Sequence, residues 1–395
     1  MNAAQSRLAG PSLTVALDMR RVNQFGYGTY IRNVVRSLAR FDRSTRYLLL
    51  GGDRHLADGL PPNFEPVRYP LAEASPRNLY ALYWLLRRHG ADLLHVPHYD
   101  WIPQHLPCPH VVTVHDLVDF LYPNPPGRRV SRWLKYQLIR RSLLRAGRII
   151  AVSRTTRRDI QRTFGVPAER ITVVYNAIDE RFLRGHASPA ERAAVAARYA
   201  IDAPFVLYTG SVRPHKNVVR LIEAFAALKA ELAGTAQADL KLIVIGDEVS
   251  RQPALRRAVV RCRMQNEVRF LGFVPVDVLR VFYDTARVFA FPSLYEGFGL
   301  PPLEAMAHGT PVVTSNTSSL AEVLQQAALL VNPDNVYDIM RGLRRCLFDE
   351  ELRAHLIQAG YAQAARYSWD LAAASLRDIY QQVAAAAPRA LVAGV

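Results

Sequence analysis

The sequence predicts an α/β protein made of two doubly wound domains. The chain has 395 residues, too many for one ordinary hydrophobic core, so two domains are the expectation. Short apolar runs alternate with amphipathic stretches, a pattern typical of parallel sheets that carry helices on both faces. This alternation runs through the first part of the chain and then begins again, so we expect two separate sheets.

The first series of strands and helices is assigned to an N-terminal domain of residues 1–182. Its β-like runs are Leu13–Met19, Tyr47–Leu50, Leu93–Val96, Val111–His115, Arg148–Val152 and Ile171–Tyr175. Its helix-like segments are Gly28–Arg40, Leu79–Arg88, Arg128–Arg145 and Thr155–Phe164. The chain is expected to pass to the next domain near Ile178–Gly185.

The second series is assigned to a C-terminal domain of residues 183–366. Its expected strands are Phe205–Thr209, Leu240–Ile245, Val268–Leu271, Val288–Phe291 and Pro311–Val313. Its expected helices are Val218–Leu232, Pro253–Arg263, Val276–Thr285, Pro302–His308 and Asp334–Phe348. In residues 367–395 a last helix, Trp369–Ala385, is expected to cross back to the first domain. Two such domains facing each other form one cleft at the carboxyl ends of their strands.

Composition excludes several classes of protein. A hydrophobic content of 50% with 21% charged residues is typical of a folded soluble protein and argues against disorder. No apolar run approaches the ~20 residues of a membrane-spanning helix, and the N-terminus resembles no signal peptide, so a cytoplasmic protein is expected. Three scattered cysteines, Cys108, Cys262 and Cys346, offer neither a disulfide framework nor a zinc site.

The positive charge is concentrated in the first half of the chain. Residues 1–186 hold 28 Lys and Arg against 14 Asp and Glu, or +14, while the rest holds 22 against 20, or +2. Such asymmetry points to a polyanionic partner, either nucleic acid or an anionic membrane, unless it reflects an arginine-rich composition. The stretch Arg128–Arg145, with Trp133 and Tyr136, is basic and amphipathic. It could lie on an anionic membrane or simply present a solvated cationic face.

The most informative motif runs from Glu296 to Glu304. It follows an expected strand and opens an expected helix, and its prolines suit a first helical turn. Gly297 and Gly299 allow close approach of a ligand to the backbone, and a helix N-terminus binds phosphate readily. The two glutamates flank that position, where they could hold hydroxyls of a sugar and a ribose. The glycines alone would favour a capped helix with a glycine-rich segment before it.

Several ordered motifs resemble those of the family 4 glycosyltransferases, which have the GT-B fold of two Rossmann-like domains. The frame Ser-Leu-Tyr-Glu-Gly-Phe-Gly-Leu-Pro-Pro-Leu-Glu-Ala-Met-Ala, with its two glutamates, resembles the family signature. Tyr208–Asn217 is similar to the diphosphate-binding loop, and Gly26–Tyr30 to the N-terminal glycine loop. Further matching elements are Val112–Leu117, Ala151–Ser153 and Tyr175–Asp179.

The resemblance implies that Lys216 contacts the phosphates of a donor sugar nucleotide. This lysine stands where a helix begins, and a cation there opposes the helix dipole until an anion is bound. Family members often carry arginine just before the lysine, whereas this sequence has His215, so Arg213 is expected to serve as the second cation. The amides of Phe298, Gly299 and Leu300 are expected to complete the phosphate site.

The remaining site residues follow from the same resemblance. Glu304 is expected to hold the ribose, and Glu296 and His115 to orient the donor sugar. Other expected donor contacts are made by Gly26, Gly28 and Glu322, although Glu322 would equally suit a charge at a helix N-terminus. Asp116 either supports the site or caps the next segment. The sequence contains no Asp-x-Asp motif, so neither a divalent metal nor another cofactor is expected.

The resemblance implies a retaining glycosyltransferase that moves a hexosyl group from a sugar nucleotide. The pattern His95-Val-Pro-His-Tyr-Asp100 is most similar to bacterial mannosyl- and rhamnosyltransferases of surface polysaccharide assembly, so GDP-mannose is the preferred donor. The acceptor, bound on the N-terminal side, would be a glycan or a polyprenyl-linked glycan, reached by peripheral attachment to the inner face of the cytoplasmic membrane. One alternative is a sugar-nucleotide epimerase of the same fold. A nucleic-acid-binding protein would explain the charge but leave the glutamate motif unexplained, so no nucleic acid partner is expected.

Overall fold

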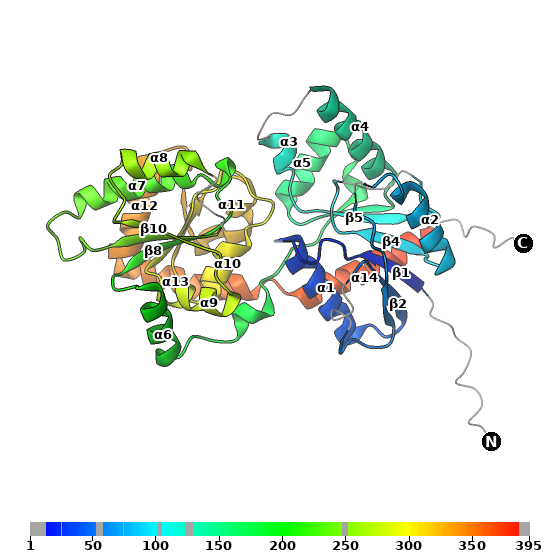
Figure 1. Cartoon of the computed structure of the whole chain (residues 1–395), viewed down its shortest axis with the longest axis horizontal. Helices are drawn as coiled ribbons and strands as arrows, with labels where there is room; N and C mark the ends of the chain where they lie inside the picture. The colour runs from blue at the N-terminus through cyan, green and yellow to red at the C-terminus, as the bar shows by residue number, and fades with distance from the viewer. Residues whose placement is uncertain are drawn as a thin grey trace, which may run out of the picture. The chain divides into compact units, whose positions relative to one another are not determined.

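The chain forms two compact α/β units in the computed structural model (Figure 1). The structure describes residues 13–24, 26–52, 58–73, 75–100, 105–122, 129–246 and 252–386. Unit 1 combines the residues up to Asn176 with those from Trp369 onward, and unit 2 is Ala177–Ser368. The boundary after Asn176 thus lies a few residues before residue 182, where the N-terminal domain was predicted to end.

Unit 1 is built on a parallel sheet of seven strands in the order β3-β2-β1-β4-β5-β6-β7. The strands are β1 (Leu13–Asp18), β2 (Thr45–Leu50), β3 (Phe64–Val67), β4 (Leu93–Val96), β5 (His110–Val114), β6 (Arg148–Ala151) and β7 (Ile171–Val173). Strand β3 was not predicted; it holds Pro66 and pairs only with β2, at the edge where proline is tolerated.

Helices cover both faces of this sheet. They are α1 (Tyr27–Phe41), α2 (Asn78–Arg88), α3 (Val118–Leu121), α4 (Arg129–Arg145), α5 (Arg154–Phe164) and α14 (Trp369–Ala386). Apolar side chains of α2, α4 and α5 share one core with the strands, whereas α14 packs against α1, β1 and β4. Within the basic stretch that could lie on an anionic membrane, the side chain of Ile139 is buried in that core, so it cannot face a membrane.

Unit 2 is built on a parallel sheet of six strands in the order β10-β9-β8-β11-β12-β13. The strands are β8 (Phe205–Gly210), β9 (Lys241–Gly246), β10 (Val268–Gly272), β11 (Val288–Phe291), β12 (Val312–Ser315) and β13 (Leu329–Val331). The helices are α6 (Pro189–Tyr199), α7 (Val218–Glu231), α8 (Pro253–Arg261), α9 (Val276–Thr285), α10 (Leu300–Ala307), α11 (Ser318–Leu324), α12 (Val336–Phe348) and α13 (Glu350–Ala365).

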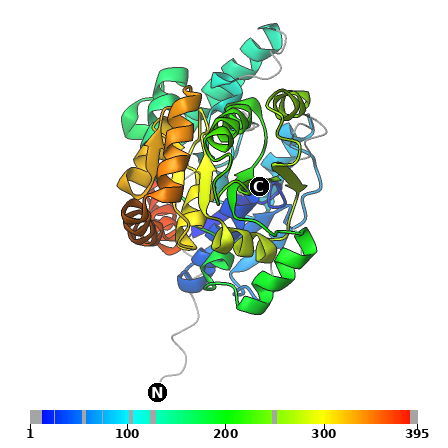
Figure 2. The same ribbon diagram turned by 90° about the vertical axis from the view of Figure 1, so that its left-hand side faces the viewer.

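The helices of unit 2 form two layers around its sheet, as Figure 2 shows with this unit toward the viewer. Helix α7 packs against α8 and α12, and α10 packs against α9 and α13. Four elements were not predicted: α6, α11, α13 and β13. Helix α6 nevertheless carries a sequence signature, because Ser188 and Glu191 form a capping box around Pro189.

Both sheets reverse their strand order at one place, between β1 and β4 in unit 1 and between β8 and β11 in unit 2. In doubly wound sheets, ligands bind outside the carboxyl ends of the strands at such a switch point. The loops that follow β1, β4, β8 and β11 are therefore the places to look for a site. Among the helices that the structure describes, none combines the length and the apolar composition needed to span a bilayer.

Candidate functional site

The loops after β8 and β11 are tied together at the switch point of unit 2. The amide of Leu294 donates to the carbonyl of His215 over 2.7 Å. The side-chain amide of Asn217 donates to the carbonyl of Pro292 over 3.0 Å and to that of Pro333 over 2.7 Å. Asn217 has a φ of 62°, a left-handed conformation that asparagine tolerates better than most residues. These bonds fix the backbone on either side of Lys216.

Lys216 and Glu296 form an ion pair across these two loops. The lysine Nζ lies 2.6 Å from one carboxylate oxygen of Glu296 and 2.7 Å from the other. The side chains are only 17% and 11% exposed, so solvent screens the pair weakly. An anion bound here would compete with Glu296 for the ammonium group, and the released carboxylate could then accept hydrogen bonds from hydroxyls.

The N-terminus of α11 holds the loop that carries Glu296. The amide of Glu296 donates to Ser318 Oγ over 3.0 Å, and Ser319 Oγ donates to the carbonyl of Glu296 over 2.8 Å. Gly299 precedes α10 with a φ of 100°, and a Cβ at this position would lie 2.6 Å from the buried Leu320 side chain. The position therefore requires glycine for both its conformation and its packing.

Helix α10 begins at Leu300 and continues with two prolines, Pro301 and Pro302. Proline has no N–H, so fewer amides point outward from this helix start than from an ordinary one. Gly299 is the N-cap and Leu300 the first residue of α10, so their amides belong to those at a helix start that have no partner within the helix. The ring of Phe298 is buried and packs edge-on against Tyr367, with ring centroids 5.4 Å apart.

Glu304 lies one turn into α10 and is buried. Its Oε2 accepts a hydrogen bond of 2.9 Å from the hydroxyl of Tyr283 on α9. Burial raises the pKa of the Glu304 carboxyl to about 7, and nearby Asp179 adds to the increase, whereas the Tyr283 bond and Arg181 oppose it. The carboxyl is therefore poised to gain or lose a proton near neutral pH.

The other expected phosphate-site residues differ in exposure. Arg213 is exposed at the start of a short 3-10 helix, Pro214–Lys216. His215 is buried, and burial together with Lys216 and Arg213 lowers its pKa to about 3, so its ring is neutral. It therefore supplies no positive charge beside Lys216. Glu322 is half-buried on α11, close enough to Tyr367 to influence the pKa of that phenol.

His115 directly follows β5 in unit 1. Its Nε2–H donates to the carbonyl of Pro97 over 3.2 Å, and burial lowers its pKa to about 4. The neutral ring therefore keeps an acceptor lone pair on Nδ1. Its faces are fixed by Tyr27 and Tyr30, whose rings stand edge-on with centroids 5.0 and 4.8 Å away.

The loop between β1 and α1 packs closely against itself. Gly26 has a φ of 75°, and a Cβ on Gly28 would overlap the carbonyl of Val22. Both expected donor contacts thus belong to unit 1, where their immediate role is to let the loop turn and place Tyr27 against His115.

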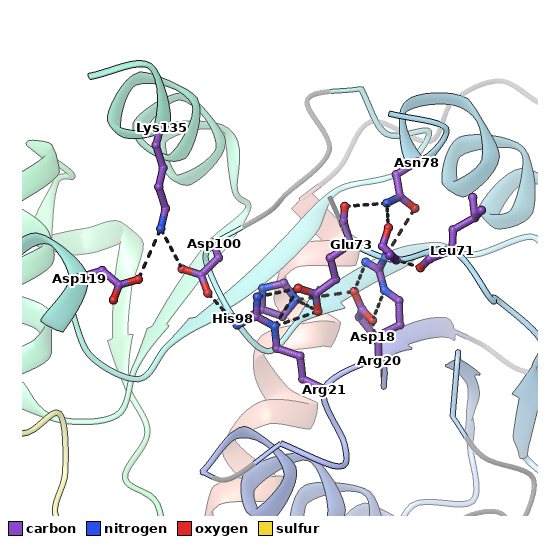
Figure 3. Close-up of polar contacts among 11 residues, drawn as sticks. Asp18, Arg20, Arg21, Leu71, Glu73, Asn78, His98, Asp100, Asp119 and Lys135 are labelled. Atoms are coloured by element: carbon purple, nitrogen blue, oxygen red, sulfur yellow. Dashed lines mark hydrogen bonds and ion pairs between the residues drawn. The ribbon is translucent and has the colours of Figure 1, made fainter. Parts of the chain in front are cut away.

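A network of charged side chains supports this loop at the switch point of unit 1 (Figure 3). Arg21 lies 2.6 Å from Glu73 and 2.7 Å from Asp100, and its guanidinium stands 5.0 Å from the centre of the Tyr27 ring. Burial alone would raise the pKa of Glu73, but His98 and Arg21 lower it to about 2, which keeps the carboxylate charged. None of these side chains was predicted as a site residue; His98 and Asp100 entered the sequence prediction only as part of the His95–Asp100 pattern.

The other residues left open by the sequence have local roles in the structure. His95 bonds Tyr380 of α14 over 2.6 Å and Thr113 over 2.8 Å, so it joins α14 to the sheet. His110 Nε2 donates to the carbonyl of Ser142 over 3.2 Å. Asp116 accepts a 2.9 Å hydrogen bond from the amide of Val118. It thus caps the segment that follows it, which is one of the two roles expected from the sequence.

Two histidines and an aspartate form a cluster at the end of α10, about one helical turn from Glu304. The Nδ1 atoms of His186 and His308 lie 2.7 and 2.8 Å from the same oxygen of Asp284. These are hydrogen-bond distances, whereas two ligands of a tetrahedral zinc ion at about 2.0–2.1 Å stand more than about 3 Å apart. The other nitrogen of His308 is buried without a hydrogen-bond partner among the described residues, so a metal on Nδ1 would leave its N–H unpaired. The geometry favours a hydrogen-bonded cluster.

Comparison with protein-family models gives two matches that divide the chain between them. Residues 26–182 match the model described as Glycosyltransferase Family 4, and residues 195–363 match the model described as Glycosyl transferases group 1. Lys216, Glu296 and Glu304 fall within the second match, and His115 falls within the first.

Individual relatives agree with these models. An O-antigen chain mannosyltransferase B from Escherichia coli is 34% identical over 288 residues, covering 73% of each chain. The serotype-specific mannosyltransferase WbdA of the same species is 33% identical over 57% of this chain, which spans only 27% of that longer protein. The solved sucrose-phosphate synthase from Thermosynechococcus elongatus has the same fold, with a TM-score of 0.75, 20% identity and coverage of 95% of this chain and 100% of that one.

Proposed function

Since the chain belongs to the family 4 glycosyltransferases of the GT-B fold, we propose that it transfers a mannosyl group from GDP-mannose to a glycan acceptor with retention of configuration. The Escherichia coli relative that matches 73% of this chain is named a mannosyltransferase, which supports mannose as the sugar. The observation that carries the proposal is the Lys216–Glu296 pair beside the start of α10, at the switch point of unit 2.

The chemistry follows from where charge develops. As the bond between the sugar C1 and the diphosphate oxygen breaks, negative charge grows on the departing nucleoside diphosphate. We assign the stabilisation of that charge to Lys216, Arg213 and the amides of Phe298, Gly299 and Leu300, because cations and N–H groups aimed at developing charge usually make the largest single contribution to catalysis. No divalent metal is assigned a role in this step.

The new bond forms between the acceptor oxygen and C1 on the face that the diphosphate leaves. We assign the acceptor's hydroxyl proton to the departing phosphate oxygen, so that no protein nucleophile is needed. Glu296, released from Lys216, and His115, with its free Nδ1 lone pair, would accept hydrogen bonds from hydroxyls of the donor sugar. Glu304 would accept hydrogen bonds from the ribose.

Ligand-induced thermal stabilisation tests the donor. A ligand at ~100 times its dissociation constant adds ~2.7 kcal/mol, so a panel of GDP-, UDP- and dTDP-sugars should reveal one clear stabiliser. We expect GDP-mannose, and an acceptor-dependent product whose anomeric proton shows the donor's α configuration by NMR. An inverted product, or stabilisation by another sugar nucleotide alone, would refute the corresponding part. Conversion of the donor to a different sugar nucleotide without acceptor would instead identify an epimerase.

A further inference from the structure

A hydrogen-bonded chain reaches Glu304 from the end of β8. Thr209 Oγ1 lies 2.8 Å from the hydroxyl of Tyr283, which in turn donates to Glu304 Oε2 over 2.9 Å. Because the phenol hydrogen is used on Glu304, the threonine hydroxyl must donate to the phenol oxygen. All three side chains are buried, so the bonds form in a region of low dielectric constant where they are strong.

Tyr283 is also held as a ring. It packs edge-on to Phe289, with centroids 5.6 Å apart, and stacks on His308 at 5.9 Å. His308 follows Glu304 by one helical turn on the same face of α10 and bonds Asp284, the neighbour of Tyr283. Two polar contacts therefore join α9 to the end of α10, and the phenol cannot swing away from Glu304 without breaking this packing.

The bond leaves one carboxylate oxygen of Glu304 for a ligand. Tyr283 bonds Oε2, and within the described residues no hydrogen bond is formed with Oε1. A ribose diol donates hydrogen bonds, and a charged carboxylate accepts them more strongly than a protonated carboxyl group does. Burial, Tyr283, Asp179 and Arg181 set this charge state, and the ion pair of His308 with Asp284 lies about one helical turn away, at the end of α10.

We propose that Tyr283, held by Thr209, is a positioning residue for donor binding, which aims Glu304 and keeps it ionised toward the ribose of the sugar nucleotide. The proposal rests on the function proposed above, because it assigns Glu304 to the ribose. A hydrogen bond donated to a carboxylate stabilises the charged form, so its removal raises the carboxyl pKa. Raising that pKa leaves less ionised Glu304 at neutral pH and shifts donor binding toward alkaline pH.

The test is the dissociation constant of GDP-mannose, measured by calorimetry between about pH 5.5 and 8.5. In the wild type, affinity should increase as the pH rises through the pKa of Glu304, near 7. Tyr283→Phe keeps the ring packing but loses the hydroxyl. We expect about tenfold weaker binding at pH 7 and a midpoint at higher pH, with affinity partly recovered at the alkaline end. Thr209→Val should shift the midpoint in the same direction by less.

A matched control separates positioning from general destabilisation. Tyr47 in unit 1 is likewise fully buried, and its hydroxyl donates a bond of the same length, 2.9 Å, to Asp42. Tyr47→Phe should leave the pH profile of donor binding unchanged.

Glu304→Gln distinguishes the two levels of the proposal. It should abolish the pH dependence and weaken binding. If Glu304→Gln binds GDP-mannose as tightly as the wild type, the ribose role of Glu304 fails. If Glu304→Gln weakens binding while Tyr283→Phe keeps the wild-type midpoint, the positioning role of Tyr283 is overturned and Glu304 keeps its own.

Discussion

At the scale of single residues, the contacts of Lys216 bear most directly on the proposed function. Its ammonium group touches both oxygens of Glu296, and both partners are largely withdrawn from solvent. Such a pair keeps each charge compensated while no ligand is bound, and it offers a diphosphate a lysine that is already in place. Removing the lysine should therefore affect both stability and binding.

Lys216→Met should weaken GDP-mannose binding by about 10- to 100-fold, since a charge-assisted hydrogen bond contributes roughly 1.5–3 kcal/mol. Titration calorimetry measures the change. Lys229→Met is a suitable control, because Lys229 is also mostly buried and lies 2.8 Å from Glu267 in the same unit. It should lower the unfolding temperature but not the affinity; equal losses of affinity in both variants would contradict a direct role for Lys216.

At the scale of elements, the start of α10 depends on one glycine. Gly299→Ala would place a side chain at a φ of 100° and against Leu320. We expect it to lower the free energy of unfolding by more than the ~1–2 kcal/mol that a left-handed conformation alone costs, and to weaken donor binding. Gly234→Ala is the control, because Gly234 has a φ of 78° with nothing within 4 Å of its Cβ position. Similar affinities for the two variants would show that the helix start is not part of the donor site.

Helix α4 gives the second prediction at this scale. Trp133 and Leu134 are 62% and 52% exposed, and Arg132 and Lys135 on either side of them are also exposed, so the exposed surface of this part of α4 includes both apolar and cationic groups. We propose that this surface attaches unit 1 to an anionic bilayer, where each cation contributes about 1 kcal/mol. Binding should weaken with salt as the Debye length falls from ~10 Å at 0.1 M to ~3 Å at 1 M.

Co-sedimentation with anionic and zwitterionic vesicles measures this attachment. Trp133→Ser should reduce binding to anionic vesicles, whereas Tyr337→Ser, at a 68% exposed position on α12 of unit 2, should not. Equal binding to both lipids, or none at low salt, would rule out electrostatic docking. The family assignment would stand, because it does not depend on this surface.

For the molecule as a whole, the proposed mechanism predicts metal-independent turnover. Protein cations and backbone amides are assigned to the diphosphate, so excess EDTA should leave the initial rate of mannosyl transfer unchanged. The control is a metal-dependent glycosyltransferase assayed in the same buffer, which should lose activity. Loss of turnover that Mg²⁺ or Mn²⁺ restores would contradict the mechanism.

Much of the architecture could be predicted because it follows from local patterns. Alternating apolar runs and amphipathic stretches located most strands and helices to within a few residues. Several of the missed elements have weak patterns, such as the edge strand β3 with its Pro66 and the three-residue strand β13. Glu296, Gly299 and Glu304 could be found because one loop and the helix after it hold all three.

The sequence by itself determined the two doubly wound units and the family motifs, since periodicity and spacing are properties of neighbouring residues. Only the tertiary structure decided which charges meet. Arg21 reaches Glu73 and Asp100 across 52 and 79 residues, and Tyr283 reaches Glu304 from another helix. It also decided protonation, because burial gives His115 a pKa of about 4 and Glu304 one of about 7. Pairing and burial arise when parallel strands bring distant loops to one edge of a sheet, and no local pattern records which side chains will meet there.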